Sequence, residues 1–500
     1  MTELHRPIVF SFLDRYSVIA LNLVMTTIVA RLMTPDEIGV FVIGAALVVL
    51  METLRDFGVS SYLIQEREIT EGGVRTAFTA MLILSLIFAI GIYLLAGPIA
   101  RFYGDQRIEP VLHITAFGFL FGPFVAPNMA LLRRDLSFGS IALINVSGAA
   151  ANFIGTLSLA AFGAGYLSLA WGALASSITV ALVVNVLRRQ FWIFCPSIQA
   201  WRKVAAFGGY SSATALVNAI FQLLPQLVLG RTLSLDAVGI YSRAVIICQL
   251  PDRAIVGALQ PLILPALAAQ ERRGDDLKKN YLLAIGYLTA VLWPGLVCLA
   301  LLADPLVALL LGAQWSATAP LVRIMAIGSL FLAPAALTYP TLVAVGRVRD
   351  TLTSSLVSLP ISTAIVSVSS FIGLKAVAAS MLVTAPFQVW IALSYVRRHV
   401  RFAWIDIAIA VRKSVLVALF TALPPAAAVA LSGFRFDLSM TTMAVSLAGA
   451  VAGWLLGLAI TAHPLLAGLR GFIVQMFTAA KDFQAERVSG GAPADRLSEL

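Results

Sequence analysis

The chain has 500 residues, of which 60% are hydrophobic and only 12% are charged, with a net charge of +10 and a mean hydropathy of +0.92. Soluble globular proteins carry about 25% charged residues, so this composition excludes a set of ordinary soluble domains. Apolar runs of about 20 residues, long enough to cross a hydrocarbon core, recur along the whole length. The sequence therefore predicts an all-α polytopic membrane protein.

The first residues, MTELHRPIVF, are not typical of a cleavable signal peptide. Such a signal has a basic start and an uninterrupted apolar core, whereas Asp14 and Arg15 interrupt the apolar residues that follow. The first apolar segment is therefore expected to remain in the membrane as an uncleaved helix.

Fourteen membrane-spanning helices are predicted from the apolar runs. In chain order they cover residues 9–31, 38–64, 76–97, 110–132, 139–162, 167–187, 204–229, 237–265, 281–303, 320–345, 352–372, 376–396, 414–432 and 440–461. The connections between them are short and hold turn-forming residues, as in MTPDEIG and GRVRDT. The C-terminal stretch QAERVSGGAPADRLSEL is polar and rich in small residues, a composition that favours disorder.

The distribution of Lys and Arg predicts the orientation of these spans. With the N-terminus in the cytoplasm, 24 of the 35 Lys and Arg fall in cytoplasmic segments and six fall on the opposite side. Cytoplasmic segments of membrane proteins carry such an excess, so we expect an even number of spans with both ends in the cytoplasm. The same bias accounts for the net charge of +10, and no nucleic-acid partner is needed to explain it.

Two short phrases occur twice in the chain. RLMTPDEIGVF begins at Arg31 and its match RTLSLDAVGIY begins at Arg231. PVLHITAFGFLF begins at Pro110 and its match PLVRIMAIGSLF begins at Pro320. Periods of about 200 residues are too long for stacked short repeats, so they indicate two duplicated halves of six spans each. Because six is even, the halves run parallel and should form two pseudo-symmetric lobes around a central cavity, with two extra helices outside the repeat.

The expected organisation follows from this duplication. We expect an N-terminal six-helix lobe in residues 1–190 and an interfacial connector in 191–203. A C-terminal six-helix lobe follows in 204–400, helices 13 and 14 lie in 401–461, and a cytoplasmic, partly disordered tail covers 462–500. Two lobes around a cavity are the geometry of alternating access, in which rigid-body rocking opens the cavity to one side of the membrane and then to the other. Duplicated bundles also occur as scaffolds or receptors, but the pattern favours a transporter.

Three phrases of the chain resemble bacterial polysaccharide flippases, the Wzx-type members of the multidrug/oligosaccharidyl-lipid/polysaccharide exporter superfamily. They are Ala30–Gly39 at the end of the first span, Asp56–Gly58 followed by Ile64–Gln65, and the turn Gly312–Pro320. The resemblance covers spans one to twelve. It implies that the chain flips an undecaprenyl-diphosphate-linked oligosaccharide across the bacterial inner membrane, for exopolysaccharide or O-antigen (lipopolysaccharide) biosynthesis. Membrane lipids, a polysaccharide polymerase and its chain-length machinery are the partners that it implies.

Charged side chains inside the predicted spans need an explanation, because each costs at least ~2.5 kcal/mol at the bilayer centre. Three adjacent pairs lie in the cytoplasmic half of spans from both lobes: Asp14–Arg15, Arg55–Asp56 and Asp252–Arg253. A guanidinium group donates two parallel hydrogen bonds to a phosphate, so Arg15, Arg55 and Arg253 are the candidates for binding the substrate diphosphate. Arg253 is the main candidate, because it is the deepest charge in the eighth span.

Two other interpretations of these charges stay open. Asp14, Asp56 and Asp252 are also candidates for an inner gate, in which they pair with arginines of the opposite lobe until substrate releases them. Alternatively, the arginines of the first two spans lie close enough to the membrane surface to extend into water. Glu52, one turn before Arg55, is expected either to pair with it or to carry a coupling cation.

No enzyme activity is expected from the sequence. A membrane polysaccharide polymerase or ligase, the rival from a different class, needs catalytic residues in a large outer loop, and the outer loops here are short. No metal cluster, nucleotide motif or nucleophile constellation occurs, so neither a metal nor a cofactor is expected. A multidrug exporter of the same superfamily is the nearest rival, but three arginines do not suit its more apolar cavity. The coupling ion, proton or sodium, and the identity of the sugar are not specified.

Three further positions are given structural roles. Trp315 and Arg243 are expected to anchor the chain at the outer membrane interface, where Trp in particular is enriched. Prolines within the spans, Pro334 among them, are expected to act as bending points.

Overall fold

All regular elements of the described residues are helices. The computed structural model describes residues 2–56, 59–66, 69–256 and 277–466, and within them it does not describe the side chains of 2–15, 61, 65, 203, 205–214 and 348. Most of the predicted tail and parts of predicted spans two and eight lie outside the described residues.

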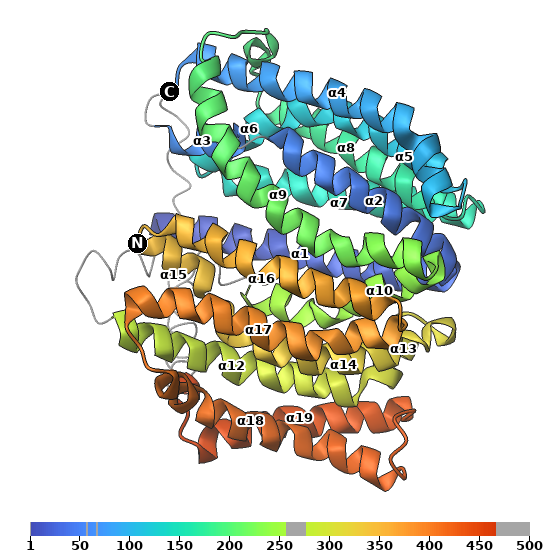
Figure 1. Cartoon of the computed structure of the whole chain (residues 1–500), viewed down its shortest axis with the longest axis vertical. Coiled ribbons are helices and arrows are strands. Elements are labelled where there is room, and N and C mark those ends of the chain that lie inside the picture. The colour runs from blue at the N-terminus through green and yellow to red at the C-terminus, as the bar shows by residue number, and fades with distance from the viewer. Residues whose placement is uncertain (1, 57–58, 67–68, 257–276, 467–500) are drawn as a thin grey trace, which may run out of the picture.

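The described helices are grouped by the predicted organisation into two sets, called here the N-terminal and C-terminal repeats, a short connector and a final helical hairpin (Figure 1). The N-terminal repeat comprises α1 (Thr2–Leu32), α2 (Pro35–Asp56), α3 (Val59–Gln65), α4 (Glu71–Tyr103), α5 (Ile108–Gly118), η1 (Phe119–Phe121), α6 (Gly122–Arg134), α7 (Phe138–Ala161) and α8 (Leu167–Leu187), and the connector contains η2 (Phe191–Phe194). The C-terminal repeat comprises α9 (Trp201–Thr232), α10 (Leu235–Cys248), α12 (Leu277–Leu301), α13 (Ala303–Leu310), η3 (Ala313–Trp315), α14 (Thr318–Leu332), η4 (Ala333–Ala335), α15 (Thr338–Ala344), α16 (Val348–Ser370) and α17 (Leu374–Val400). The hairpin is α18 (Trp404–Leu431) and α19 (Met440–Ile460).

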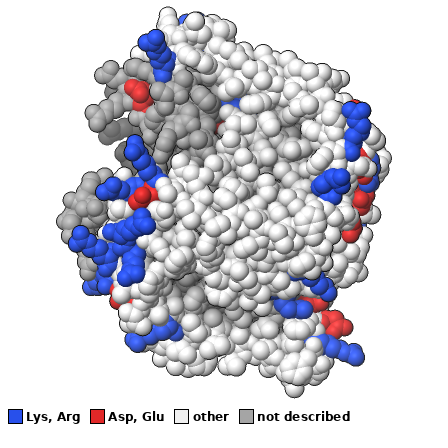
Figure 2. Space-filling model, viewed as in Figure 1, with Lys and Arg blue, Asp and Glu red and all other residues white. Residues whose placement is uncertain are grey.

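The surface of the protein matches a membrane. Within the described residues, eleven helices are long and apolar enough to cross a bilayer. Figure 2 shows Lys, Arg, Asp and Glu gathered at the two ends of the bundle, with a broad uncharged band between them. Helices suit this environment because each one satisfies its own backbone hydrogen bonds where no water can do so. The chain is therefore an all-helical, multi-pass membrane protein, as the sequence predicts, and fourteen spans are compatible with this arrangement.

Predicted spans four and ten are interrupted, which the apolar runs do not indicate. The first is divided by η1, directly before Gly122 and Pro123, and the second is divided by η4, which contains Pro334. Proline lacks the N–H that would bond to the preceding turn, so the helix tightens or bends at these places. Pro334 lies in such a break, whereas Pro225, Pro294 and Pro360 lie inside continuous helices, and the role of the prolines as bending points stays a prediction. Ile108–Arg134 is nevertheless long and apolar enough to cross the membrane as one segment, so predicted span four is confirmed apart from this break.

The repeated phrase lies where α2 and α10 cross. A Cβ atom added to Gly39 would lie closer than 3.0 Å to the backbone carbonyl of Leu235, and one added to Gly239 would lie equally close to that of Pro35. The two contacts are images of each other at an offset of 200 residues, so the two halves meet about a pseudo-two-fold axis. The phrase is present twice because each copy supplies the glycine against which the other copy packs. We call this end of the bundle the crossing end; the N-terminus lies at the opposite end (Figure 1).

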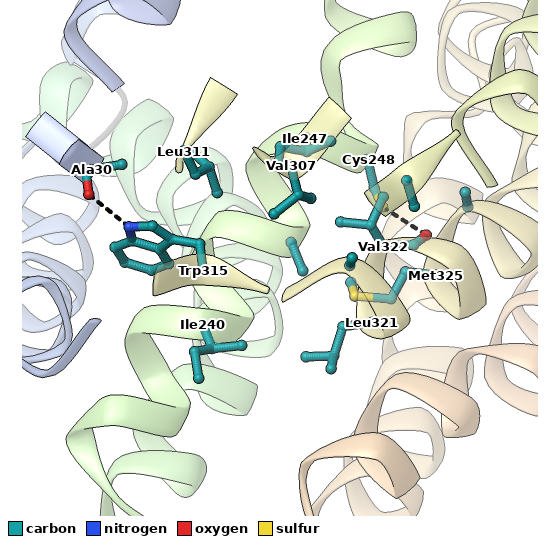
Figure 3. Packing of buried hydrophobic residues seen from close by; sticks show 14 of the residues in the cluster. Ala30, Ile240, Ile247, Cys248, Val307, Leu311, Trp315, Leu321, Val322 and Met325 are labelled. Carbon is teal, nitrogen blue, oxygen red and sulfur yellow. Dashed lines mark hydrogen bonds between the residues drawn. The ribbon is translucent and has the colours of Figure 1, made fainter. Parts of the chain in front are cut away.

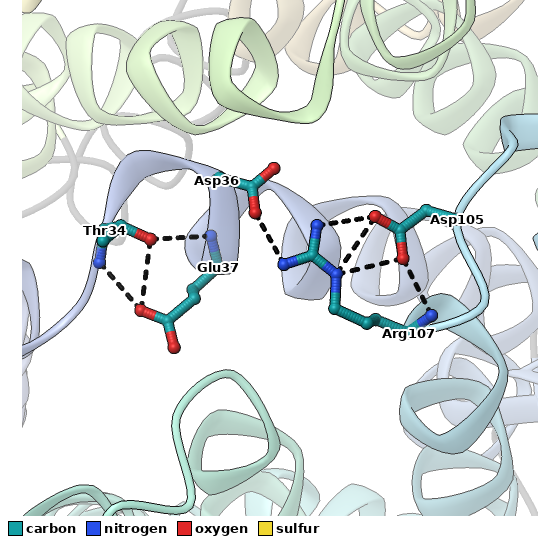
Figure 4. A network of polar contacts seen from close by, with 5 residues as sticks. All are labelled: Thr34, Asp36, Glu37, Asp105 and Arg107. Atoms are coloured by element: carbon teal, nitrogen blue, oxygen red, sulfur yellow. Dashed lines mark hydrogen bonds and ion pairs between the residues drawn. The ribbon is translucent and has the colours of Figure 1, made fainter.

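Each copy of the phrase also starts its helix with a hydroxyl cap. Thr34 Oγ1 accepts the backbone N–H of Glu37 at 3.3 Å, and Glu37 Oε2 accepts the backbone N–H of Thr34 at 2.9 Å, which is a capping box (Figure 4). In the second copy Ser234 Oγ accepts the backbone N–H of Ala237 at 3.1 Å. The caps fix where α2 and α10 begin, and hence where their glycines meet.

An ion-pair network fastens the first of these helices to the loop after α4. Arg107 Nη1 lies 2.6 Å from Asp36 Oδ2 at the start of α2, and its Nη2 lies 2.6 Å from Asp105 Oδ2 (Figure 4). The hydrogen bonds from Arg107 hold the pKa of Asp105 below its ordinary value. The hydrogen bond that Arg107 donates to Asp105, followed by the one that it donates to Asp36, raises the pKa of Arg107. All three residues belong to the N-terminal repeat, so this network stiffens one half without joining it to the other.

The hairpin α18–α19 docks on the C-terminal repeat through a buried polar chain. Thr289 Oγ1 of α12 donates to Ser414 Oγ of α18 at 2.9 Å, and Ser414 Oγ lies 3.5 Å from His463 Nε2. The backbone N–H of Leu465 donates to His463 Nδ1 at 3.2 Å, so the proton of the neutral ring belongs on Nε2 and faces Ser414. His463 is only 3% exposed. Burial, followed by the charge of Lys413, lowers the pKa of His463.

Docking of this hairpin is therefore expected to weaken in acid. Because the folded state holds His463 neutral, the unfolded ring, with a pKa of about 6.5, takes up a proton first as the pH falls. The contribution is fully present above that value and is lost below it. We expect the melting temperature of the detergent-solubilised protein to fall between pH 8 and pH 5 by more than that of His463→Gln, which cannot titrate. Equal pH profiles for the two proteins would contradict this assignment.

Candidate functional site

A cavity of about 640 Å³ lies among α9, α10, α12, α14, η4 and α17. Its wall is mainly apolar, with polar groups from Gln222, Gln226, Gln249, Asp252, Arg253 and Ser329. Every residue of its lining belongs to the C-terminal repeat. Cavities of roughly 300–1,000 Å³ with a few convergent polar groups are typical of ligand sites, so this volume suits a headgroup rather than a whole lipid.

Arg253 presents a positive charge to this cavity. Its side chain is exposed, and Nη2 donates to Gln249 Oε1 at 2.7 Å, one helical turn earlier. The amide oxygen of Gln249 helps to orient the guanidinium group. Asp252 is exposed and lines the same cavity. Of the two predicted diphosphate-binding arginines whose side chains the structure describes, Arg55 and Arg253, it is Arg253 that lines this cavity.

Arg55 lies at the end of α2, packed inside the N-terminal repeat. Its side chain is 14% exposed, and Nη1 lies 4.0 Å from Glu52 Oε1. The guanidinium group is 5.6 Å from the ring centroid of Phe119 and so close to Gly122 that a Cβ there would collide with it. Its Nε is buried without a hydrogen-bond partner. Arg55 therefore fills the break between α5 and α6, which the sequence does not reveal.

For the remaining predicted site residues, the structure gives fewer side-chain contacts. The side chains of Asp14 and Arg15 lie outside the described residues. Tyr16 Oη donates to the carbonyl of Ala254 at 3.1 Å, so α1 lies next to the segment that carries Arg253. Asp56 Oδ1 accepts the hydroxyl of Ser60 at 2.7 Å. Pairing of the aspartates across the two lobes stays a prediction.

Trp315 and Arg243, predicted to anchor the chain at the membrane interface, are both buried, so that prediction is wrong. Trp315 is 0% exposed and lies among apolar side chains of both repeats (Figure 3). Arg243 is 8% exposed, and its Nε has no hydrogen-bond partner. It follows Gly239 by one turn of α10 and so lies on the side of that helix that meets α2. The position of Arg243 just after the repeated phrase was the signal that could have indicated its burial where α10 meets α2.

Comparison with known proteins agrees with this architecture. A family model described as polysaccharide biosynthesis protein matches residues 28–320, which is more than half of the chain. The chain belongs to this family. Two relatives from bacteria are each 24% identical to it. The lipopolysaccharide biosynthesis protein WzxC of Escherichia coli (strain K12) matches 62% of this chain and 63% of its own length. The succinoglycan biosynthesis transport protein ExoT of Rhizobium meliloti (strain 1021) matches 68% of this chain and 69% of its own length.

Two solved membrane transporters share the fold of this chain. The lipid II flippase MurJ in an inward closed conformation aligns with a TM-score of 0.73 at 16% identity, covering 92% of this chain and 100% of MurJ. An inward-facing multidrug resistance transporter of the MATE family aligns with a TM-score of 0.60 at 17% identity, covering 78% of this chain and 94% of its own. The chain matches less than two thirds of the length of WzxC.

Proposed function

We propose that this protein flips a diphosphate-linked polyprenyl oligosaccharide across the bacterial inner membrane by alternating access, for exopolysaccharide or O-antigen biosynthesis. The observation that carries the proposal is the placement of Arg253 in a cavity of about 640 Å³, beside Asp252. The guanidinium group matches a phosphate in charge and in hydrogen-bond geometry. The names of WzxC and ExoT, and the fold shared with a lipid II flippase, support the same class of substrate.

The chemistry of the cavity suggests where each part of the substrate binds. The diphosphate binds Arg253 and, from the other repeat, the arginines of the first two spans, Arg15 and Arg55. The sugar occupies the polar part of the cavity, and the polyprenyl chain stays in lipid, where burial of its apolar surface requires nothing from the protein. Asp14, Asp56 and Asp252 hold the inner gate when substrate is absent, and Glu52 is the candidate carboxylate for a coupling proton or sodium ion.

The membrane placement belongs to the same proposal. Both termini face the cytoplasm, in keeping with the excess of Lys and Arg on that side, and the crossing end faces the opposite side. The product is then delivered where a polysaccharide polymerase and its chain-length machinery can use it. The protein itself catalyses no covalent step.

Reconstitution of the purified protein tests this function directly. Liposomes containing a fluorescent polyprenyl-diphosphate-linked sugar, with and without the protein, are treated with a membrane-impermeant enzyme that cleaves the sugar. Without flipping, only the outer leaflet, about half of the lipid, is accessible. With the protein, accessibility should approach completion.

A dye-efflux measurement on the same vesicles separates the rival function. If the lipid-linked sugar stays half accessible while a cationic dye is moved, the protein is a multidrug exporter and the proposal is wrong. A control lipid carrying the same sugar on a neutral linkage should remain about half accessible, because Arg253 then has no diphosphate to bind.

A further inference from the structure

A sharp turn joins α13 to α14 at the crossing end of the C-terminal repeat. Gly312 has φ +98°, a backbone region that L side chains rarely adopt, and its carbonyl accepts the backbone N–H of Trp315 at 3.1 Å. This geometry holds the one-turn helix η3 (Ala313–Trp315) against the opposite repeat. Gln314 and Trp315 thereby reach the C-terminal end of α1.

Both side chains cap the end of α1 from the other half of the protein. Trp315 Nε1 donates to the carbonyl of Ala30 at 2.6 Å (Figure 3), and Gln314 Nε2 donates to the carbonyls of Met33, at 3.0 Å, and of Ala30. The last carbonyls of a helix have no partner within the helix and carry its negative dipole end, so they are good acceptors for such donors. A bond in the opposite direction, from Arg31 Nη2 to the carbonyl of Leu309 at 2.7 Å, completes the contact.

The same contact buries the indole ring between the repeats. Trp315 is fully buried in a cluster that includes Val29 of α1, Met33 directly after α1 and Ile240 of α10. Moving α1 away from the turn would break these hydrogen bonds together and expose the ring to water. A closed crossing end is therefore held by polar and apolar contacts that form and break as one unit.

Among the residues that the structure describes, the other repeat shows no equivalent of this contact. At the offset of 210 residues, the position of Trp315 is taken by Asp105, which binds Arg107 in its own repeat. Arg231, the counterpart of Arg31, instead lies 5.4 Å from the ring centroid of Phe102. One side of the pseudo-symmetric crossing thus carries a specific set of donors that the repeat alone would not produce.

We propose that Gln314 and Trp315 are positioning residues that form a latch on α1, and that release of this α1 latch is the step that opens the crossing end during transport. The inference rests on the proposed function for its place in a transport cycle. The latch itself makes a prediction that needs no substrate: weakening it should raise the exposure of the crossing end.

A reporter cysteine measures that exposure. Cys195, Cys248 and Cys298 are replaced by serine or alanine, and Val29→Cys, at a position 1% exposed in the closed seam, is introduced. Cells and inverted vesicles are labelled with a membrane-impermeant maleimide, so that each side is probed separately. Trp315→Phe keeps a ring but removes the N–H donor, and Gln314→Leu removes the amide at an exposed position, where folding is little affected.

The labelling rate from one side should rise about five-fold for each neutral hydrogen bond removed, and further in the double variant. Trp293→Phe is the matched control. It removes a bond of the same kind, from Trp293 Nε1 to the carbonyl of Leu330 at 2.7 Å, but within one repeat, so labelling should not change. Unchanged labelling in both Gln314→Leu and Trp315→Phe, or an equal rise in Trp293→Phe, would overturn the latch.

The flipping measurement keeps the two proposals separate. Faster labelling in the latch variants together with half-accessible lipid in the wild-type vesicles would reject the function and retain the latch. Normal flipping by the wild type together with unchanged labelling in the variants would reject the latch and retain the function.

Discussion

Gly39→Ala is expected to stop transport while leaving the protein in the membrane. The new methyl group would be driven into the backbone carbonyl of Leu235, and no side-chain rotation can relieve a clash with backbone inside a helix. Overpacking in a tight core typically costs 1–3 kcal/mol, and a backbone collision belongs at about 3 kcal/mol or above. A penalty of that size shifts the population of the closed crossing end by about 100-fold. The cycle would then lack the state in which that end is sealed.

Because Gly239 is the pseudo-symmetric counterpart of Gly39, Gly239→Ala is expected to impair flipping as strongly as Gly39→Ala. Gly239→Ala drives the same methyl group into the carbonyl of Pro35, so both variants should lose flipping in the liposome assay and expose the Val29→Cys reporter. Gly91→Ala and Gly139→Ala are the matched controls, because a Cβ at either position meets nothing within 4 Å. Normal flipping by Gly39→Ala would mean that the two halves do not need this close approach.

Arg253→Ala is expected to reduce flipping by about 100-fold. A bidentate contact to a phosphate contains two charge-assisted hydrogen bonds, and losing two of them, at 1.5–3 kcal/mol each, costs at least about 3 kcal/mol. Cells that depend on the variant should retain lipid-linked repeat units on the inner leaflet. Arg253→Lys keeps the charge but not the planar fork, so partial activity is expected. Arg101→Ala, at an exposed arginine in the last turn of α4, is the control.

Two variants at Arg55 and its neighbour Gly122 test whether the position of the Arg55 guanidinium group matters as well as its charge. Arg55→Ala removes the charge, whereas Gly122→Ala keeps it and displaces the guanidinium group that now packs against Gly122. If Arg55 binds diphosphate, both changes should lower the rate of flipping, and Arg55→Ala should lower it more than Gly122→Ala. Gly118→Ala, whose new atom would lie no closer than 3.8 Å to its nearest neighbour, should be neutral. Wild-type flipping in both Arg253→Ala and Arg55→Ala would remove these arginines from the mechanism.

Much of the fold could be predicted from local patterns. A long apolar run must form a helix in lipid, because only a helix satisfies its own backbone there, so the spans follow from composition. Hydroxyl residues before α2 and α10 fix where those helices start, and the recurring glycine marks the crossing. The break at η1 could not be located in this way, because apolar runs look alike whether a 3₁₀ turn divides them or not.

The candidate site was predictable in part. An arginine in the eighth span has few reasons to exist other than function, and Arg253 does line the cavity. The packing of Arg55 on Phe119 and Gly122 was not predictable, because it depends on the helix break. Trp315 was misplaced because its amphipathic side chain suits a membrane surface and a buried seam equally well when only its neighbours in the chain are known.

By itself, the amino-acid sequence determined the membrane class, the duplication and the positions of charge along each span, because these depend on residues close together in the chain. The tertiary structure alone decided which groups meet across the seam. Trp315 and Ala30 are 285 positions apart, and whether an indole N–H finds a carbonyl at that separation depends on how two packed surfaces fit. Their contact exists only in an arrangement of the whole bundle.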